Sequence, residues 1–144
     1  MKYNENILAQ LGNMDQSEVN DYLTEKGINL HRNGFIRDGV GIFGVGGSNA
    51  TPFNTPTEFS EEEIETFLLD SIDKIKDATL KIMVPHMPPK NTKLDIISAG
   101  VHVGSQSVHD FILKHKPDIV LSGHIHEARG SDTIENTLAF NAGM

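Results

Sequence analysis

The side chains best suited to chemistry in this chain are one asparagine and three histidines, each placed just after an apolar run. They are Asn13, His86, His124 and His126, within residues 12–15, 86–89 and 123–126. Each apolar run is typical of a β-strand, and ligands of α/β sheets gather where strands end at their carboxyl edge. Imidazole nitrogen with amide oxygen suits Mn, Fe, Zn or a similar ion better than Ca or Mg. We therefore expect the fold to assemble a metal centre here.

Each of these motifs taken alone has an ordinary structural explanation. A single histidine after a strand, such as His86, is more often a hydrogen-bonded loop residue than a ligand. Asp15, with Glu18 three residues later, has the spacing of a helix-capping box, so residues 12–15 alone indicate a turn before a helix. Gly-His-x-His is short enough to arise by chance. The three segments in this order are much less expected by chance than any one of them.

The elements that must position these residues alternate along the chain. Apolar runs predict strands at 7–11, 34–37, 40–45, 80–84 and 118–122, and one or two edge strands within 133–140. Helical spacing predicts helices at about 16–26 and 61–77, and a third that begins near Ser107 and ends at Pro117. Residues 87–104 are expected to be mostly loop. This alternation indicates an α/β domain.

Short local signals fix several turns and helix ends. Asp38-Gly39 between two apolar runs predicts a two-residue β-hairpin. Ser60 with Glu63 predicts a capping box, and Ser107 with Asp110 at its third position predicts another helix start. The run 61–63 of three glutamates is attributed to a helix N-terminus, which favours negative charge. The pattern Gly-x-Gly-x-x-Gly at 39–44 lies in strand-like sequence, so we do not interpret it as a dinucleotide site.

Composition limits the class of protein. The chain has 144 residues, no cysteine and a formal net charge of −8. It is long enough for one domain with a real core, and it has no disulfides or thiolate sites. The scattered basic residues form no nucleic-acid patch, no run has the length of a membrane span, and no secretory signal is present at the start. We therefore expect a cytoplasmic protein that binds neither nucleic acid nor membrane.

Taken together, these segments resemble the calcineurin-like metallophosphoesterases of the small YfcE-like prokaryotic type. That family's signature is D-x-H, G-D-x-x-D, G-N-H-[DE], a single His and G-H-x-H, and the last three elements match residues 12–15, 86 and 123–126. Further similar segments cover 45–49, 86–89, 100–105 and 125–130, so that nearly the whole chain is included.

The resemblance implies a fold, an activity and a set of ligands. It implies two packed mixed β-sheets flanked by helices, and a metal-dependent phosphoric ester hydrolase that cleaves a small phosphomonoester or phosphodiester. Two divalent ions (Mn, Fe, Zn or Ni) would be bound. Asn13, His86 and His124 would hold one ion and His126 would contribute to the other. Such a pair of ions positions a hydroxide and stabilises the charge of in-line displacement.

The chain departs from the family pattern in two places. No D-x-H or G-D-x-x-D precedes Asn13, so we expect residues 1–144 to be a single, partial domain that lacks the N-terminal strands and the bridging carboxylate. An unpaired sheet edge would then favour a homo-oligomer. In addition, Met14 replaces the motif's histidine, and a thioether cannot donate a proton. Because the bridging carboxylate is absent, we expect weak turnover of phosphate esters or none.

The remaining histidines differ in their sequence surroundings. His102 lies between Gly100 and Gly104 and is a candidate catalytic residue that would line the site. The other three histidines, His31, His109 and His115, have no partner at motif spacing and are expected on the surface or on helices. Ser105 and Ser107 lie near His102 and His109, but the sequence around them does not match the Gly-x-Ser-x-Gly nucleophile elbow.

Two further functions remain open from the sequence. The first is a non-catalytic scaffold of the same fold that binds partners through its surface. The missing ligands and Met14 favour it, whereas the retained Asn13, His86, His124 and His126 favour the enzyme. The second is a gene fragment without an independent function.

Overall fold

The computed structural model describes residues 6–143 of the chain. Its elements follow one another in the order α1 (Ser17–Glu25), β1 (Asn33–Arg37), β2 (Val40–Val45), α2 (Glu61–Asp73), β3 (Leu80–Pro85), α3 (Gln106–His115), β4 (Ile119–Ser122), the 3-10 helix η1 (His126–Ala128), β5 (Gly130–Ile134) and β6 (Thr137–Asn141). The predicted α/β class is confirmed, and residues 87–104 form the long loop that was expected.

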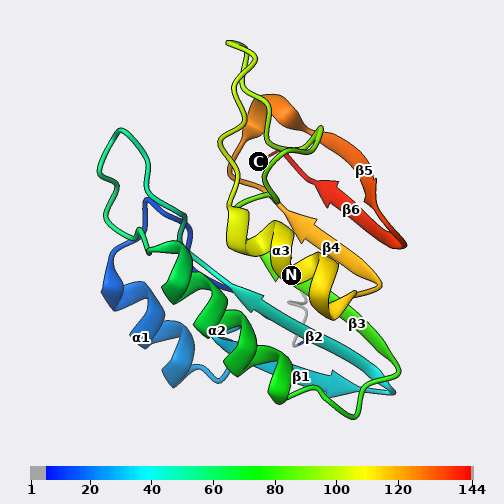
Figure 1. Cartoon of the computed structure of the whole chain (residues 1–144). Helices are drawn as coiled ribbons and strands as arrows, with labels where there is room; N and C mark the ends of the chain where they lie inside the picture. Colours follow the sequence, from blue (N-terminus) through cyan, green and yellow to red (C-terminus); the bar gives the residue numbers. More distant parts are fainter. Residues whose placement is uncertain (1–5, 144) are drawn as a thin grey trace, which may run out of the picture.

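The strands form one six-stranded mixed sheet in the order β1-β2-β3-β4-β6-β5 (Figure 1). Strands β2, β3, β4 and β6 run parallel, while β1 and β5 pair antiparallel at the two edges. Two packed sheets were expected, and residues 6–143 form a single one. The reason is that β6 pairs with β4 and so continues the same sheet. Of the two predicted edge strands, β5 is an edge and β6 is internal.

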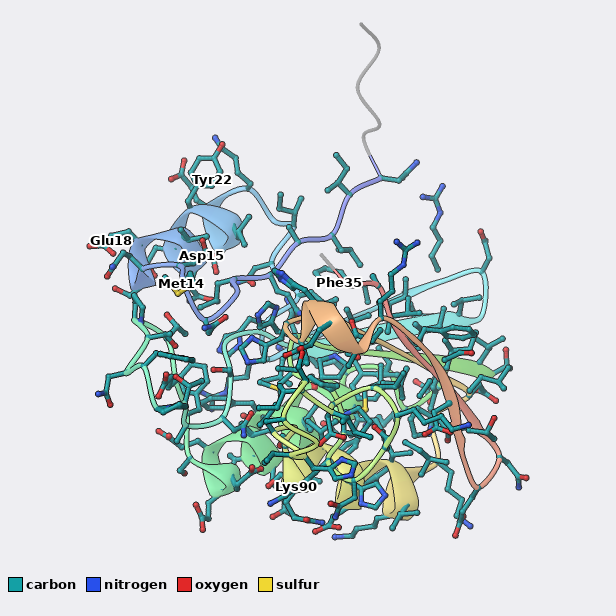
Figure 2. All side chains as sticks on the ribbon, turned by 90° about the horizontal axis from the view of Figure 1, so that it is seen from above. Met14, Asp15, Glu18, Tyr22, Phe35 and Lys90 are labelled. Carbon is teal, nitrogen blue, oxygen red and sulfur yellow. The ribbon has the colours of Figure 1, made fainter. Side chains whose placement is uncertain are left out.

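Helices α2 and α3 cover one face of this sheet, whereas residues 6–11 and η1 lie across the opposite side (Figure 2). The core between helices and sheet contains fully buried side chains from both layers: Phe43, Val45, Ile64, Leu68, Met83, Ile112 and Val120. On the opposite face, Leu121 of β4 pairs with Phe140 of β6, and both stay exposed. The helix-covered face therefore provides most of the buried apolar surface.

The predicted hairpin and the capping box of Ser60 and Glu63 are confirmed. Asp38 and Gly39 have φ of 51° and 80°, the left-handed pair that a two-residue turn requires between β1 and β2. Ser60 accepts from the backbone N–H of Glu63 at 3.2 Å, and the Glu63 carboxylate accepts from the backbone N–H of Ser60 at 2.9 Å. Both signals depend only on neighbouring residues.

The predicted strand at 7–11 is wrong. Ala9 makes a single bridge to Asn29, with hydrogen bonds from Ala9 N to Ile28 O and from Leu30 N to Ala9 O. Two residues later, Leu11 accepts instead from the backbone N–H of Gly47 at 3.0 Å. The segment is extended, but it shares its hydrogen bonds between two different loops and therefore forms no ladder.

Two predicted helix caps are also wrong. Helix α1 begins after Gln16, which provides no side-chain cap, because the Asp15 carboxylate accepts from the backbone N–H of Gly12 at 2.7 Å instead. Helix α3 is capped by Ser105, whose hydroxyl accepts from the Val108 N–H, and not by Ser107. Helix α2 ends at Asp73, four residues before the predicted end, and continues only as turns.

None of the helices within residues 6–143 combines the length and the apolar character needed to cross a membrane.

Candidate functional site

The amide of Asn13 is the centre of the candidate site. Its Oδ1 lies 3.2 Å from His86 Nε2 and 3.1 Å from His124 Nδ1, and the two rings are 5.0 Å apart between centroids. The Asn13 Nδ2 group donates to Thr55 Oγ1 at 3.1 Å, so the amide oxygen is the end that faces the histidines. The fold therefore brings together three of the four residues named from the sequence, from segments 73 and 111 positions apart.

The ends of three adjacent parallel strands hold this arrangement. His86 directly follows β3, its N–H donates to Val45 O at the end of β2, and its carbonyl accepts from Gly123 N just after β4. Asn13 is tied to the neighbouring loop because its carbonyl accepts from Thr57 N at 3.0 Å. The site lies at the carboxyl edge of the parallel strands, where ligands of α/β sheets collect.

The turn after β4 places the two histidines of the Gly-His-x-His motif. His124 has φ of 65°, a left-handed conformation that is uncommon for a residue with a side chain. Such backbone strain persists only where the surrounding structure enforces it, and it concentrates at functional sites. His126 begins η1 two residues later. The two side chains thus leave a turn, as expected, and not opposite faces of a strand.

Burial keeps the two inner histidines neutral. It lowers the pKa of His86 to about 4, with a smaller contribution from the nearby His124, and Asp15 opposes the shift. Burial also lowers the pKa of His124, and the positive form of His126 adds to that effect. A metal binds only deprotonated imidazole nitrogen, so depressed pKa values leave both rings ready to act as ligands near neutral pH.

Two cavities meet at these residues. The smaller, about 340 Å³, is bounded by residues 12–15 with His86, His124 and His126. The larger, about 670 Å³, shares Asn13, His124 and His126 and extends to Lys90 and His102. Met14, 70% exposed, lines the smaller cavity, and Figure 2 shows it beside Asp15 on the loop that leads to α1. His126 borders both cavities.

The two imidazoles and the amide oxygen form part of a ligand set for one transition-metal ion. Two donor atoms that each lie about 2.0–2.1 Å from one metal ion, at a right angle, are about 3 Å apart from each other. The Asn13 oxygen lies 3.1 Å from the His124 nitrogen and 3.2 Å from the His86 nitrogen, close to that spacing. Within residues 6–143, however, no three His, Cys, Asp or Glu side chains form a group that could hold a metal. The set is two imidazoles and an amide oxygen, a combination suited to Mn, Fe, Zn or Ni.

Close packing also constrains the ligand geometry. A Cβ on Gly12 would lie 3.1 Å from Cε1 and 3.3 Å from Nε2 of His86, which is tighter than ordinary contacts. A side chain at position 12 would therefore force the His86 ring to shift by a few tenths of an ångström.

His102 has a partner that the sequence did not single out. Its Nδ1 lies 2.6 Å from Oδ1 of Asp95, a carboxylate that is fully buried in the loop after β3. Asp95 precedes His102 by seven residues, and this spacing corresponds to no motif that would have predicted the contact. The sequence signal that drew attention to this loop was the pair of glycines, Gly100 and Gly104, on either side of His102. His102 lines the larger cavity, as expected from the sequence.

Glu58 is a second residue that the sequence did not identify. Its carboxylate accepts hydrogen bonds from the hydroxyls and backbone N–H groups of Thr51 and Thr55, which lower its pKa to about 2. Because Thr55 also accepts from the Asn13 amide, Glu58 fixes the loop that orients the central residue.

The expectation that His31 is a surface or helix residue is wrong. It stacks on Phe59 with centroids 5.5 Å apart, contacts Phe67 edge-on, and accepts from the backbone N–H of Gly46 at 3.0 Å. Burial lowers its pKa to about 4. His109 and His115 do lie on α3.

Comparison with known proteins identifies the family. A family model described as calcineurin-like phosphoesterase matches residues 1–128. The chain belongs to the calcineurin-like phosphoesterase family. It is 40% identical over 139 residues to MJ1162 of Methanocaldococcus jannaschii, described as uncharacterised, and the match covers 94% of this chain and 62% of that protein. The chain thus spans less than two thirds of the length of this relative.

Solved structures share the fold. One crystal structure superposes with a TM-score of 0.68 at 21% identity, covering 85% of this chain and 50% of the other. The protein TT1561 of Thermus thermophilus superposes with a TM-score of 0.58 at 20% identity, covering 88% of this chain and 56% of its own. At these identities the likeness supports the calcineurin-like fold alone.

Proposed function

We propose that this phosphoesterase-family chain hydrolyses a small phosphomonoester or phosphodiester with the help of bound divalent metal ions. The observation that carries the proposal is the convergence of His86 and His124 on the oxygen of Asn13, within 3.2 Å, at the mouth of two cavities. Neutral imidazoles beside an amide oxygen form a ligand set for a transition metal.

Each residue has a distinct part in this proposal. Asn13, His86 and His124 would hold one ion, and His126, at the border of both cavities, would contribute to a second. Bound divalent ions would supply an activated hydroxide and neutralise charge on the phosphoryl oxygens. The larger cavity would take the organic part of the substrate. Its open wall contains Phe53, 81% exposed.

Metal binding is tested by titrating Mn²⁺ or Zn²⁺ into the purified chain by calorimetry. His86→Ala and His124→Ala should each weaken the affinity at least about tenfold, because removing even an outer partner of a ligand costs about 10–100-fold. His109→Ala, on α3, removes an imidazole outside both cavities and is the matched control. Unchanged affinity in both site variants would remove the metal centre from this proposal.

Activity is tested with para-nitrophenyl phosphate and bis(para-nitrophenyl) phosphate in the presence of Mn²⁺. Turnover of one ester and not the other would assign the chain to monoesters or diesters, and loss of turnover in His124→Ala would tie it to the site. Tight metal binding without turnover of either ester would favour the non-catalytic scaffold.

We also propose that the chain self-associates. Strands β1 and β5 are the two edges of the sheet, and an edge strand offers unpaired N–H and C=O groups to another chain. Sedimentation velocity over a range of concentrations tests this, since a constant monomer would contradict it.

A further inference from the structure

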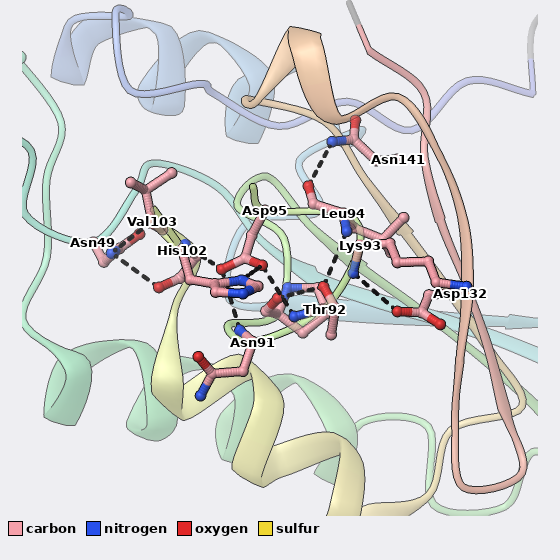
Figure 3. A network of polar contacts seen from close by, with 12 residues as sticks. Asn49, Asn91, Thr92, Lys93, Leu94, Asp95, His102, Val103, Asp132 and Asn141 are labelled. Atoms are coloured by element: carbon pink, nitrogen blue, oxygen red, sulfur yellow. Dashed lines mark hydrogen bonds and ion pairs between the residues drawn. The ribbon is translucent and has the colours of Figure 1, made fainter. Parts of the chain in front are cut away.

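Asp95 is a fully buried carboxylate whose contacts are satisfied by the protein itself. It accepts from the backbone N–H groups of Asn91, Thr92 and Gly104 at 3.2, 3.0 and 2.9 Å, and it lies 2.6 Å from His102 Nδ1 (Figure 3). A buried charge is costly unless it is paired and hydrogen-bonded. Four contacts to one carboxylate therefore indicate a built arrangement and not an incidental surface pair.

This arrangement fixes the orientation of His102. Two hydrogen bonds from the Asn49 amide, to Val103 O at 3.3 Å and Gly104 O at 3.5 Å, hold the backbone beside it (Figure 3). The Val103 N–H donates in turn to Asp95 O at 3.1 Å. A histidine that donates its Nδ1 proton to a carboxylate is locked in one tautomer, which leaves Nε2 as the working nitrogen.

The ring is also accessible from the site. The His102 side chain is 34% exposed, and it lines the larger cavity together with Asn13, His124 and His126. Among the described residues that line this cavity, the other ionisable side chains outside the proposed ligands are Lys90 and Glu127. Of His102, Lys90 and Glu127, His102 is the one that contacts a fully buried carboxylate, that of Asp95.

The proposed reaction lacks a proton donor at position 14, where the family motif has a histidine. Met14 lines the smaller cavity, and its thioether carries no proton. An alkoxide leaving group needs a proton, and a positioned general acid typically contributes about 10²–10⁴-fold to the rate.

Resting on the proposed function, we propose that His102 donates this proton from Nε2 and that Asp95 is its positioning residue. The attacking hydroxide forms the new P–O bond, and the bond from phosphorus to the ester oxygen breaks. The ester oxygen takes the proton from the doubly protonated ring and leaves as an alcohol. The ring becomes neutral and regains its proton from water.

The first test needs no activity. Long-range proton–nitrogen correlation NMR of the neutral ring should place the His102 proton on Nδ1 in the wild-type chain. Asp95→Asn should move it to Nε2, because an amide can donate to Nδ1. A wild-type ring protonated on Nε2 would overturn the proposal.

The second test compares an activated and an unactivated ester at one Mn²⁺ concentration. His102→Gln should lower turnover of ethyl phosphate about 10²-fold, and that of para-nitrophenyl phosphate much less, because a phenolate leaves without a proton. Lys90→Gln, in the same cavity, is the matched control and should leave the ratio of the two rates unchanged.

The two proposals fail in different ways. Wild-type turnover with an unchanged ratio in His102→Gln would overturn the role of His102 alone. Absence of turnover on both esters would overturn the proposed function, and the role of His102 with it.

Discussion

His31 should make the stability of this chain depend on pH. Its ring lies between Phe59 and Phe67, and its neutral Nδ1 accepts from the buried Gly46 N–H. Burial, followed by the charge of Arg32, lowers its pKa from 6.5 to about 4. The folded state therefore favours the neutral ring. The resulting stabilisation is complete above pH 6.5 and is lost as the pH falls toward 4.

The magnitude follows from the shift. A difference of about 2.5 pKa units corresponds to about 3 kcal/mol at full protonation, at about 1.4 kcal/mol per unit. Between about pH 7 and about pH 5 the linkage relation gives a loss of about 2 kcal/mol, since the ring is then largely protonated only in the unfolded chain. His31→Gln keeps an acceptor for Gly46 but cannot titrate, so its stability should fall less over this interval.

Urea denaturation at several pH values, followed by circular dichroism, measures the difference. The buried His86 also makes the folded chain less stable in acid. Both the wild type and His31→Gln contain His86, so the difference between them isolates His31. Val120→Ala is the control, because it removes buried apolar volume from β4 without removing a titratable group or a ring that contacts His31, and it should keep the wild-type slope. Parallel curves for the wild type and His31→Gln would refute the reasoning.

Three other changes test the site and the fold. Gly12→Ala places a Cβ about 3.1 Å from the His86 ring and should weaken Mn²⁺ binding by about tenfold or more in calorimetry, whereas an unchanged affinity would show that the ring can yield. Thr55→Val removes the acceptor that orients the Asn13 amide, together with one hydrogen bond to Glu58, and should lower Mn²⁺ affinity in calorimetry by about 10–100-fold, whereas an unchanged affinity would show that the Asn13 amide needs no such partner. Ser60→Ala breaks the capping box of α2 and should cost about 1 kcal/mol in urea denaturation, and a loss near zero would mean that Glu63 alone holds the helix start.

The sequence by itself determined those features that depend on neighbouring residues. Asp38-Gly39 specified its hairpin because the two residues adopt the left-handed conformation that the turn demands. Ser60 and Glu63 specified the start of α2 for a similarly local reason. The placement of His86 and His124 was also predictable, since the parallel strands β3 and β4 end at one edge and bring their following residues together.

The tertiary structure decided the contacts that polar side chains make with residues distant in the sequence. Ser107 has a capping sequence, but its N–H donates to Glu61 at 2.9 Å from the start of α2, and Ser105 takes the capping position. The partner of His102 is Asp95, brought within 2.6 Å by a loop without regular structure. Neither outcome is encoded in spacing, because a buried polar group is satisfied by whichever partner the folded chain places beside it.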